Sequence, residues 1–267
     1  MTIKVAVENR ITTISIHRPE ARNAVDPATA TALFKAFLAF EADGQSDVAI
    51  LTGDATAFCA GFDLKAAALG MTPDWLAALA IPKGWIDPAA NPLPSPMGPA
   101  RLMLSKPVIA AIEGPAVAGG LELALWCDVR IVSRSAYFGV FCRRWGVPLI
   151  DGGTVRLGRV VGEGRANDLI LSGRAVDASE ALAIGLANQV VDDGTALHAA
   201  QDYAMQLLKF PQGCMRSDRK SARMAPKAMA KALRREWASA GVILGESLRG
   251  AARFASGKGR GGSFGDI

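Results

Sequence analysis

Hydrophobic positions change their spacing several times along the chain, and each spacing predicts one kind of element. Apolar and polar residues alternate over 3–7 and 11–17, which is typical of half-buried strands, and residues 8–10 form a turn between them. Short uninterrupted apolar runs predict strands that are buried on both faces. Such runs cover residues 48–51, 108–112 and 129–132, and 137–139 is a further candidate strand.

Apolar residues three and four apart predict helices in the remaining segments. The first begins at Pro27, with Asp26 as its N-cap. Strand–helix units followed by helices alone predict an α/β core over residues 1–195 and a helical C-terminal region over 196–267. Because these late helices bring no strands of their own, we expect them to pack on the core and on a neighbouring subunit. The further predicted helices cover 121–126, 152–161, 165–171, 177–185 and most of 195–253.

Residues 66–100 break this order. They hold many prolines together with Trp75 and Trp85, which predicts a mobile insert that covers a pocket. The two tryptophans are candidates for the pocket wall, with core packing as the alternative. Residues 256–267 are glycine-rich and are expected to be loose.

Composition and cysteine usage narrow the class of protein. Of 267 residues, 50% are hydrophobic and 21% are charged, which indicates a globular chain. No apolar run is long enough to cross a membrane, and no secretory signal is visible at the start. Only His17 and His198 are available, which argues against a zinc enzyme or a Ser-His-Asp hydrolase. The four cysteines are scattered without metal-binding spacing, which favours the reducing cytoplasm and predicts no metal site.

Positive charge is concentrated in one segment. Residues 209–235 carry nine basic residues and one acid, so the rest of this chain of net charge +5 is close to neutral. Such a segment can meet the phosphates of a nucleotide-bearing ligand or of a nucleic acid, or it can be a solvated helix face. Phe210 is the one aromatic residue within it, so base stacking and nucleic-acid binding are poorly supported.

Two glycine-containing turns share one plan, because each follows a strand and precedes a helix. They lie at residues 59–63 and 118–120. Glycine lets the backbone approach a ligand closely, and the first N–H groups of a helix lack backbone partners. If both turns met at one point, their amides would form a two-donor oxyanion hole; the alternative is two tight turns without chemistry.

Four sequence segments, taken in their order along the chain, decide how the turns are interpreted. The runs are IHRPEARNA at 16–24, AFCAGFDL at 57–64, IAAIEGPAVAGGLELA at 109–124, and residues 171–187. Together they resemble the crotonase (enoyl-CoA hydratase/isomerase) superfamily over about residues 5–195. The resemblance implies a spiral of ββα units with a helical trimerisation region. It also implies an acyl-CoA substrate and no separate cofactor, because coenzyme A is part of the substrate.

The same resemblance implies roles for individual residues. The backbone amides of Phe62 and Gly119 correspond to the oxyanion hole. Phe254 and Lys258 correspond to contacts with the nucleotide end of coenzyme A, often supplied by a neighbouring subunit. Residues that correspond to the remaining substrate site are Arg22, Ala24, Ala60, Asp63, Leu64 and Cys142.

Hydratases of the superfamily resemble one another in carrying two catalytic glutamates. Glu122 matches the first and lies about one helical turn after Gly119. Cys142 stands at the second position, and a neutral thiol is no obvious substitute for a carboxylate. Asp151, which precedes a glycine pair, is the best replacement, with a helix cap as its alternative role. The predicted catalytic groups are therefore Glu122, Asp151 and the amides of Phe62 and Gly119.

The sequence leads to a hypothesis of a homo-oligomeric acyl-CoA-transforming enzyme, a trimer or a dimer of trimers, with enoyl-CoA hydration as the leading activity. An isomerase, decarboxylase or hydrolase with the same oxyanion hole is the first alternative, because Cys142 replaces the second glutamate. A non-catalytic acyl-CoA-binding protein is the second alternative. Nucleic-acid binding through residues 209–235 is the third.

Overall fold

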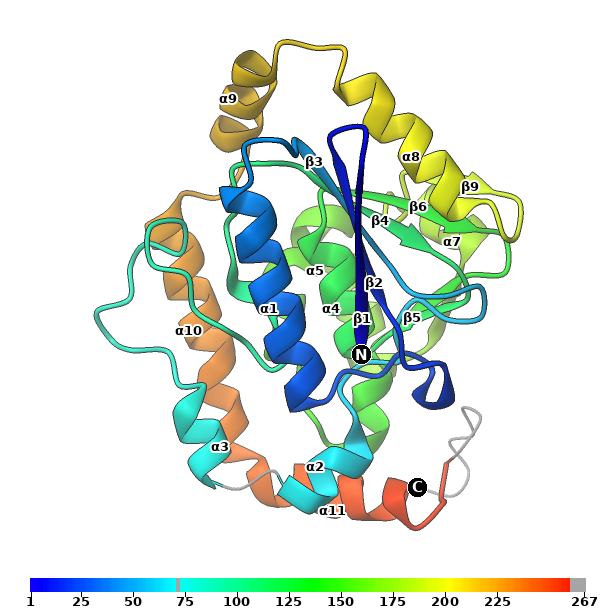
Figure 1. Ribbon diagram of the computed structural model, residues 1–267. Helices are drawn as coiled ribbons and strands as arrows, with labels where there is room; N and C mark the ends of the chain where they lie inside the picture. The colour runs from blue at the N-terminus through cyan, green and yellow to red at the C-terminus, as the bar shows by residue number, and fades with distance from the viewer. Residues whose placement is uncertain (71–72, 260–267) are drawn as a thin grey trace.

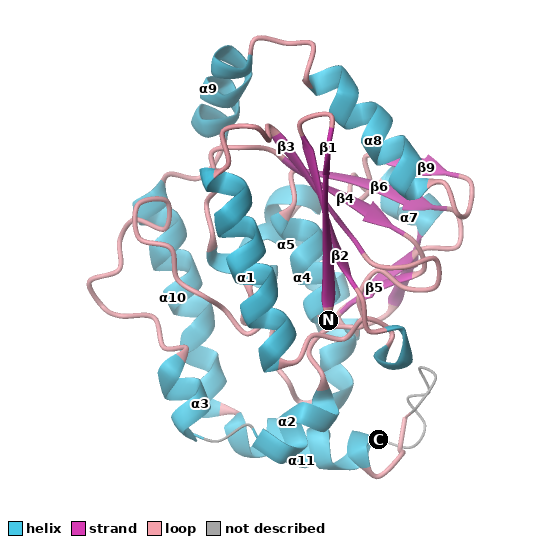
Figure 2. Cartoon of the chain, viewed as in Figure 1, coloured by secondary structure: helices cyan, strands magenta, loops and turns pink. Residues whose placement is uncertain are grey.

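A computed structural model describes residues 1–70 and 73–259 of the chain. Its main sheet has the strand order β1-β2-β3-β4-β6-β9, and its neighbouring strands are parallel except for the antiparallel pair β1–β2 (Figures 1 and 2). A smaller sheet has the order β5-β7-β8. The strands are β1 (Ile3–Glu8), β2 (Ile11–Ile16), β3 (Val48–Thr52), β4 (Val108–Ile112), β5 (Pro115–Val117), β6 (Val129–Ser133), β7 (Tyr137–Gly139), β8 (Ala175–Asp177) and β9 (Gln189–Val191).

Helices cover the main sheet and continue beyond it. The α-helices are α1 (Pro27–Ala42), α2 (Leu64–Gly70), α3 (Pro73–Ala78), α4 (Gly119–Trp126), α5 (Gly153–Val161), α6 (Glu163–Ser172), α7 (Ala178–Ala183), α8 (Ala196–Leu207), α9 (Gln212–Ala222), α10 (Pro226–Val242) and α11 (Leu244–Ala255). Short 3-10 helices are η1 (Pro19–Ala21), η2 (Pro99–Arg101) and η3 (Phe141–Trp145). The order of strands and helices agrees with the α/β order expected from hydrophobic spacing.

The apolar runs of β3 and β4 are buried on both faces. In β3, Ala49 and Leu51 join the core formed with α1 and α4, whereas Val48 and Ile50 join the core under α8. Successive side chains of a strand point to opposite faces, so a strand between two helical layers needs apolar residues at every position. The sheet therefore separates two cores and presents its ends to the loops.

Helix α8 belongs to the sheet rather than to the helices that follow it. Ala196, Ala200 and Ala204 are fully buried against β3, β4 and β6. Their spacing of four residues gives the helix a narrow face that allows close approach. The predicted division at residue 195 falls directly before this helix, and the helices that leave the sheet are α9, α10 and α11. Of these, α10 packs on α5, and α11 packs on α2 and η3 (Figure 1).

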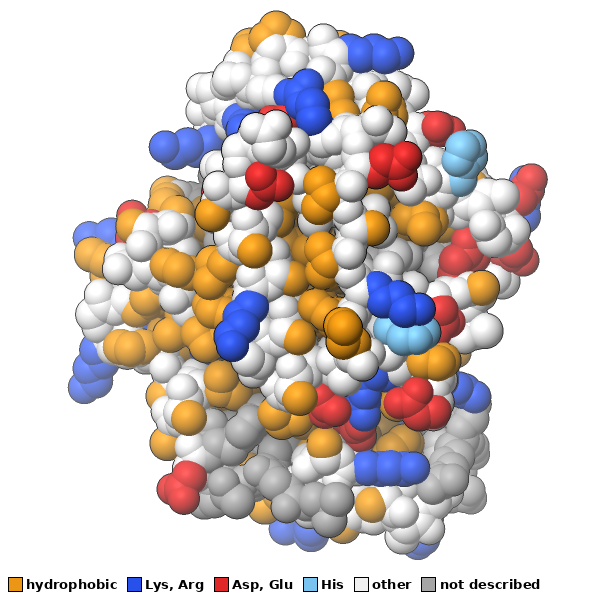
Figure 3. Space-filling model, viewed as in Figure 1, with side chains coloured by type: hydrophobic (Ala, Val, Ile, Leu, Met, Phe, Trp, Pro, Cys, Tyr) orange, Lys and Arg blue, Asp and Glu red, His pale blue; other side chains and the backbone are white. Residues whose placement is uncertain are grey.

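The basic segment 209–235 is partly used inside the protein. Arg216 pairs with Asp47, and Arg219 and Arg223 pair with Asp128 at 2.8 and 2.9 Å. On the visible face, lysines and arginines are spread over several elements rather than gathered in one patch (Figure 3). These arginines thus attach α9 and the loop that follows it to the core.

The insert at residues 66–100 makes two kinds of contact. Ile81 and Trp85 pack with Met229 and Leu233 of α10, so Trp85 has the core-packing role. The end of the insert, at Met97, reaches the main cavity. The side chain of Trp75 lies outside the described part, and so does most of the glycine-rich tail.

Membrane-spanning helices, metal-binding clusters and cysteine pairing can be examined in the described residues. No helix within 1–70 and 73–259 is both long and apolar enough to cross a bilayer. In the same part of the chain, no three histidine, cysteine or acidic side chains are arranged to hold a metal ion. The four cysteines are free thiols.

Candidate active site

The first glycine turn is an extended segment held on both sides. Cys59 pairs with β5, where its N–H donates to Pro115 O at 3.0 Å. Phe62 forms a parallel bridge with Val25, in which the flanking groups Gly61 O and Asp63 N bond to Val25. Successive amides of an extended chain point to opposite sides. The N–H of Phe62 is therefore directed away from Val25.

The second turn is strained at the residue before α4. Ala118 has φ 53° and ψ −122°, a conformation that a residue with a side chain rarely adopts. The bond from its N–H to Gly139 O, at 2.8 Å, holds it in place. Gly119 is the first residue of α4, where a helix offers no backbone acceptor. Among the described residues, nothing accepts a hydrogen bond from the Gly119 N–H.

The two turns touch each other through their glycines. A Cβ on Gly61 would lie 2.9 Å from the N of Gly119, and one on Gly120 would lie 2.1 Å from Cys59 O. Gly61 also has φ +98°, a left-handed conformation suited to glycine. Any larger residue would force the turns apart, so glycine is what allows Phe62 and Gly119 to line one wall.

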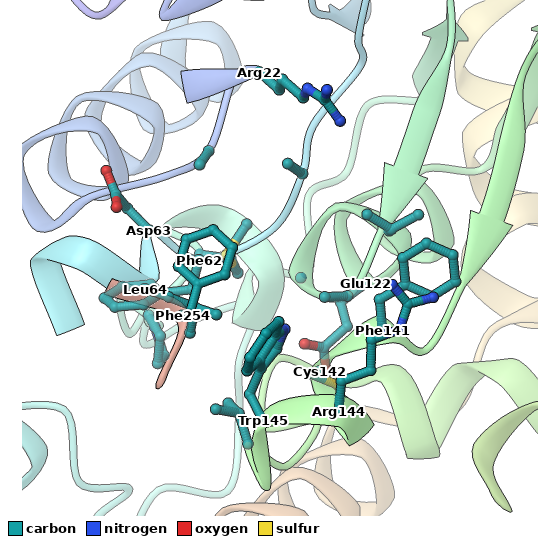
Figure 4. A pocket seen from close by; sticks show the side chains of 18 of the residues that line it. Arg22, Phe62, Asp63, Leu64, Glu122, Phe141, Cys142, Arg144, Trp145 and Phe254 are labelled. Atoms are coloured by element: carbon teal, nitrogen blue, oxygen red, sulfur yellow. The ribbon is translucent and has the colours of Figure 1, made fainter. Parts of the chain in front are cut away.

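That wall belongs to a cavity of about 890 Å³ that is closed on one side by α11. Met97, Trp145 and Ser247 also line it. Trp145 meets Phe254 of α11 edge to face, with ring centroids 5.2 Å apart. The predicted site residues that line this cavity are Arg22, Ala24, Ala60, Phe62, Asp63, Leu64, Gly119, Glu122, Cys142, Asp151 and Phe254 (Figure 4).

Glu122 and Asp151 are joined through the turn that begins α5. Glu122 Oε1 accepts the N–H of Asp151 at 2.8 Å and that of Gly153 at 2.9 Å. Asp151 Oδ1 accepts the N–H of Met97 at 2.9 Å. Both side chains are almost fully buried, with exposed fractions of 3% and 2%. The structure thus brings the two predicted carboxyl groups to one end of the cavity.

Burial decides how these acids ionise. Burial, together with the negative charges of Asp151 and Glu236, raises the pKa of Glu122 well above its usual value, although the two amides oppose the shift. Burial also raises the pKa of Asp151, against hydrogen bonds from Ser95 and Met97 and the charges of Arg101 and Arg156. Adjacent buried carboxyl groups do not ionise together readily, so the pair is suited to holding a proton at a pH where free carboxyl groups have released theirs.

Comparison with known proteins decides the family. The model of the enoyl-CoA hydratase/isomerase family matches residues 6–94 and 97–240. The chain belongs to this family. The match confirms the superfamily that the motifs predicted, and it covers both turns and both carboxyl groups.

Relatives and solved structures of the family agree with this assignment. Enoyl-CoA hydratase EchA19 of Mycobacterium tuberculosis is 36% identical over 198 residues, which are 72% of this chain and 68% of the relative. A carnitinyl-CoA dehydratase of Salmonella arizonae is 37% identical over 210 residues, which are 78% of this chain and 75% of the relative. The crystal structure of carnitinyl-CoA hydratase from Mycobacterium avium has a TM-score of 0.79 and 29% identity, and covers 96% of this chain and 95% of that one. The predicted crotonase fold is confirmed.

Cys142, which the motif resemblance places at the second glutamate position of the family's hydratases, is a buried thiol. Cys142 belongs to η3 and lies beside Glu122 of α4 (Figure 4). Burial and the charge of Glu122 raise the pKa of Cys142 to about 12. The thiol therefore stays neutral at physiological pH and forms part of the wall rather than a base.

The other end of the cavity is shaped by an ion-pair centre. Arg18 bonds to Asp63 at 3.0 Å and pairs with Asp26 at 3.2 Å. Asp63 also accepts the N–H groups of Lys65 and Ala66 and so begins α2. In this member of the family the carboxylate of Asp63 is thus engaged within the protein. Arg22 is drawn well apart from Glu122 (Figure 4).

Lys258 is the one predicted site residue that the structure does not bring to this cavity. Its side chain is exposed, and its N–H ends α11 by bonding to Arg253 O. Phe254, by contrast, reaches the cavity of its own chain through α11. The difference arises because Phe254 is the penultimate residue of α11 and faces the cavity, whereas Lys258 follows the end of the helix.

Two buried residues escaped the sequence analysis. Asn23 is fully buried and bonds to Asp54 at 2.9 Å and to Ala57 O at 2.8 Å, which ties the Arg22 turn to the segment before Cys59. Glu236 lies on α10 and bonds to the α5 turn. Asn23 lies within the run at residues 16–24 that carries the family resemblance, so the sequence could have indicated it. Nothing in the sequence distinguishes Glu236 from a surface residue.

The raised pKa of Glu122 predicts a pH-dependent contribution to stability. Between its ordinary pKa of 4.5 and the raised folded-state pKa, the folded protein holds a proton that the unfolded chain has released. The stability from this group is therefore full below about 4.5 and is lost as the pH rises. In denaturant titrations, the unfolding free energy of wild type minus that of Glu122→Gln should fall from pH 4.5 to pH 7. A difference that does not change with pH would contradict the shift.

Proposed function

We propose that this family member adds water to a 2-enoyl-CoA. The observation that carries the proposal is that Phe62, Gly119 and Glu122 line one cavity, with Glu122 one turn beyond Gly119 on α4. Two amides directed at one point can stabilise the negative charge that develops on a thioester oxygen. A carboxyl group beside them can exchange a proton with the substrate.

In the proposed reaction the water oxygen bonds to the β-carbon, and the double-bond electrons move onto the thioester oxygen as an enolate. The amides of Phe62 and Gly119 stabilise this enolate. Whichever carboxyl group of Glu122 and Asp151 is ionised takes the proton from water, and the protonated one delivers its proton to the α-carbon. The pair then holds the same number of protons as before, so no external acid or base is required.

A double-bond isomerase is the second candidate, favoured by Cys142. Moving a double bond between the α,β and β,γ positions needs proton transfer between carbons but no activated water. Because Cys142 is a buried neutral thiol, the site has one carboxyl group fewer at the position where hydratases of this family carry glutamate. Glu122 and Asp151 alone can shuttle the proton in such a reaction.

Three assays of the purified protein separate these functions. Crotonyl-CoA should lose the absorbance of its conjugated double bond as water is added. If instead crotonyl-CoA is unchanged and a 3-enoyl-CoA gains conjugated absorbance, the protein is an isomerase. If both substrates persist while calorimetry shows acyl-CoA binding, hydration and isomerisation are both excluded, and acyl-CoA binding without this chemistry is the better description.

Partners and location follow from the same proposal. Arg22 and Lys65 line the cavity and supply positive charge for the phosphates of coenzyme A. No cofactor beyond the coenzyme A of the substrate is required. A homo-oligomer, as a trimer or a dimer of trimers, is proposed from the family resemblance. The free thiols support a cytoplasmic location.

A further inference from the structure

Helix α10 brings a third carboxylate to the turn that carries Asp151. Glu236 is 7% exposed, and its Oε2 accepts the N–H of Gly152 at 2.6 Å. Its Oε1 accepts both the N–H and the hydroxyl of Thr154, at 2.8 and 2.7 Å. A side chain 82 residues away in the sequence thus holds the beginning of α5.

Glu236 and Glu122 divide the amides of this turn between them. Glu122 accepts from residues 151 and 153, and Glu236 accepts from residues 152 and 154. The first N–H groups of a helix have no acceptor within it and lie at the positive end of the helix dipole. Four consecutive amides are therefore held by two carboxyl groups, one from α4 and one from α10.

Two buried arginines face the three acids. Arg156 of α5 donates to Asp151 O and to Ala100 O at 3.1 and 2.7 Å. Arg101 is fully buried and lies over the ring of Trp237, the neighbour of Glu236 in α10, at 4.5 Å. Both arginines lie close enough to interact electrostatically with the carboxyl groups of Glu236 and Asp151. Further titratable neighbours are the neutral thiol of Cys142 on η3, beside Glu122, and Arg223, near Arg156.

We propose that Glu236 is a positioning residue of the active site. By holding the amides of residues 152 and 154 it fixes the turn, and the turn fixes the orientation of Asp151 and of the Glu122 carboxyl group bonded to it. The C-terminal helix α10 is thereby part of the catalytic architecture of its own chain. This role rests on the proposed function only in that Glu122 and Asp151 handle the proton.

Amide hydrogen exchange tests the positioning without any turnover. Gln at position 236 has one acceptor oxygen in place of two, so Glu236→Gln should speed exchange in a peptide that covers residues 151–154. Glu113→Gln is the matched control, because Glu113 is also a buried glutamate that accepts two amides, from Gly194 and Ala196, at the start of α8. That variant should speed exchange at residues 194–196 and leave the 151–154 peptide unchanged.

The kinetic arm uses whichever reaction the wild type catalyses. Glu236→Gln should lower kcat by about tenfold to a hundredfold with little change in KM, since the carboxyl groups lose their alignment. The charge of Glu236 helps to raise the pKa of Glu122. Removing this charge should therefore shift the part of the pH–activity profile that depends on Glu122 to lower pH. Glu236→Asp, which keeps the charge but shortens the side chain, should lower kcat and leave that part of the profile in place.

Clear outcomes overturn the proposal. If folded Glu236→Gln shows wild-type exchange over 151–154, or wild-type kcat and pH profile, Glu236 does not position the site. If Glu236→Gln fails to fold, Thr154→Ala removes only the hydroxyl bond, and unchanged exchange and kcat in that variant would count against the proposal. If the wild type catalyses neither hydration nor isomerisation, the proposed function fails, while exchange still decides the positioning.

Discussion

Replacing Glu122 with Gln is expected to lower kcat by about 10²- to 10⁴-fold, the range typical of a lost general acid–base group. Gln retains the side-chain length and one oxygen, which can still accept the amides of Asp151 and Gly153. The turn should therefore survive, while the group can no longer give or take a proton. Initial rates with crotonyl-CoA, or with the 3-enoyl substrate if that is the one transformed, provide the measurement.

Binding serves as the internal control for this variant. The amides of Phe62 and Gly119 and the basic residues at the far end of the cavity are untouched, so acyl-CoA affinity by calorimetry should stay near that of the wild type. A folded Glu122→Gln protein with nearly full kcat would remove Glu122 from the mechanism. Loss of affinity together with kcat would indicate instead that the substitution disturbed the cavity.

Gly61→Ala is expected to produce the second largest loss of activity. The new Cβ would lie 2.9 Å from the N of Gly119 and 3.1 Å from Val117 O, so the two turns must separate. Misplacing one oxyanion donor lowers kcat by about 10²- to 10³-fold. Steady-state kinetics should show this loss in kcat, while thermal unfolding should report a destabilisation of about 1–3 kcal/mol from the strained backbone at φ +98°.

Gly162→Ala separates backbone strain from the loss of the oxyanion site. Gly162 has φ +82°, and a Cβ there would meet nothing within 4 Å. This variant should be destabilised to a similar degree and keep the wild-type kcat. Equal loss of kcat in both variants would show that strain alone, rather than the contact between the turns, explains the effect.

Much of the fold could be predicted from the spacing of apolar residues. The runs of β3 and β4 are apolar at every position because both faces of the sheet are covered, and this is visible in the sequence. The place of α8 was less apparent, since the small side chains of Ala196, Ala200 and Ala204 are compatible with either a core or a surface helix. Its burial depends on the face of the sheet that it meets.

The site could be predicted where its parts are local. Gly119 and Glu122 stand three residues apart at the start of one helix, so their common orientation follows from helix geometry. Asp151 was proposed as the replacement carboxylate, and its contact with Glu122 depends on how α5 packs on α4. Lys258 was expected at the same site, but its exposure follows from the end of α11.

The sequence by itself determined the strand and helix order, the two glycine turns and the family, because each depends on residues close together in the chain. The tertiary structure alone decided which acids share a buried environment and which arginines lie close to them. Glu236 in a helix and Arg219 in a basic segment both resemble solvent-facing residues in sequence. Only packing removes them from water. Because burying an unpaired charge costs free energy, each is paired in the folded protein.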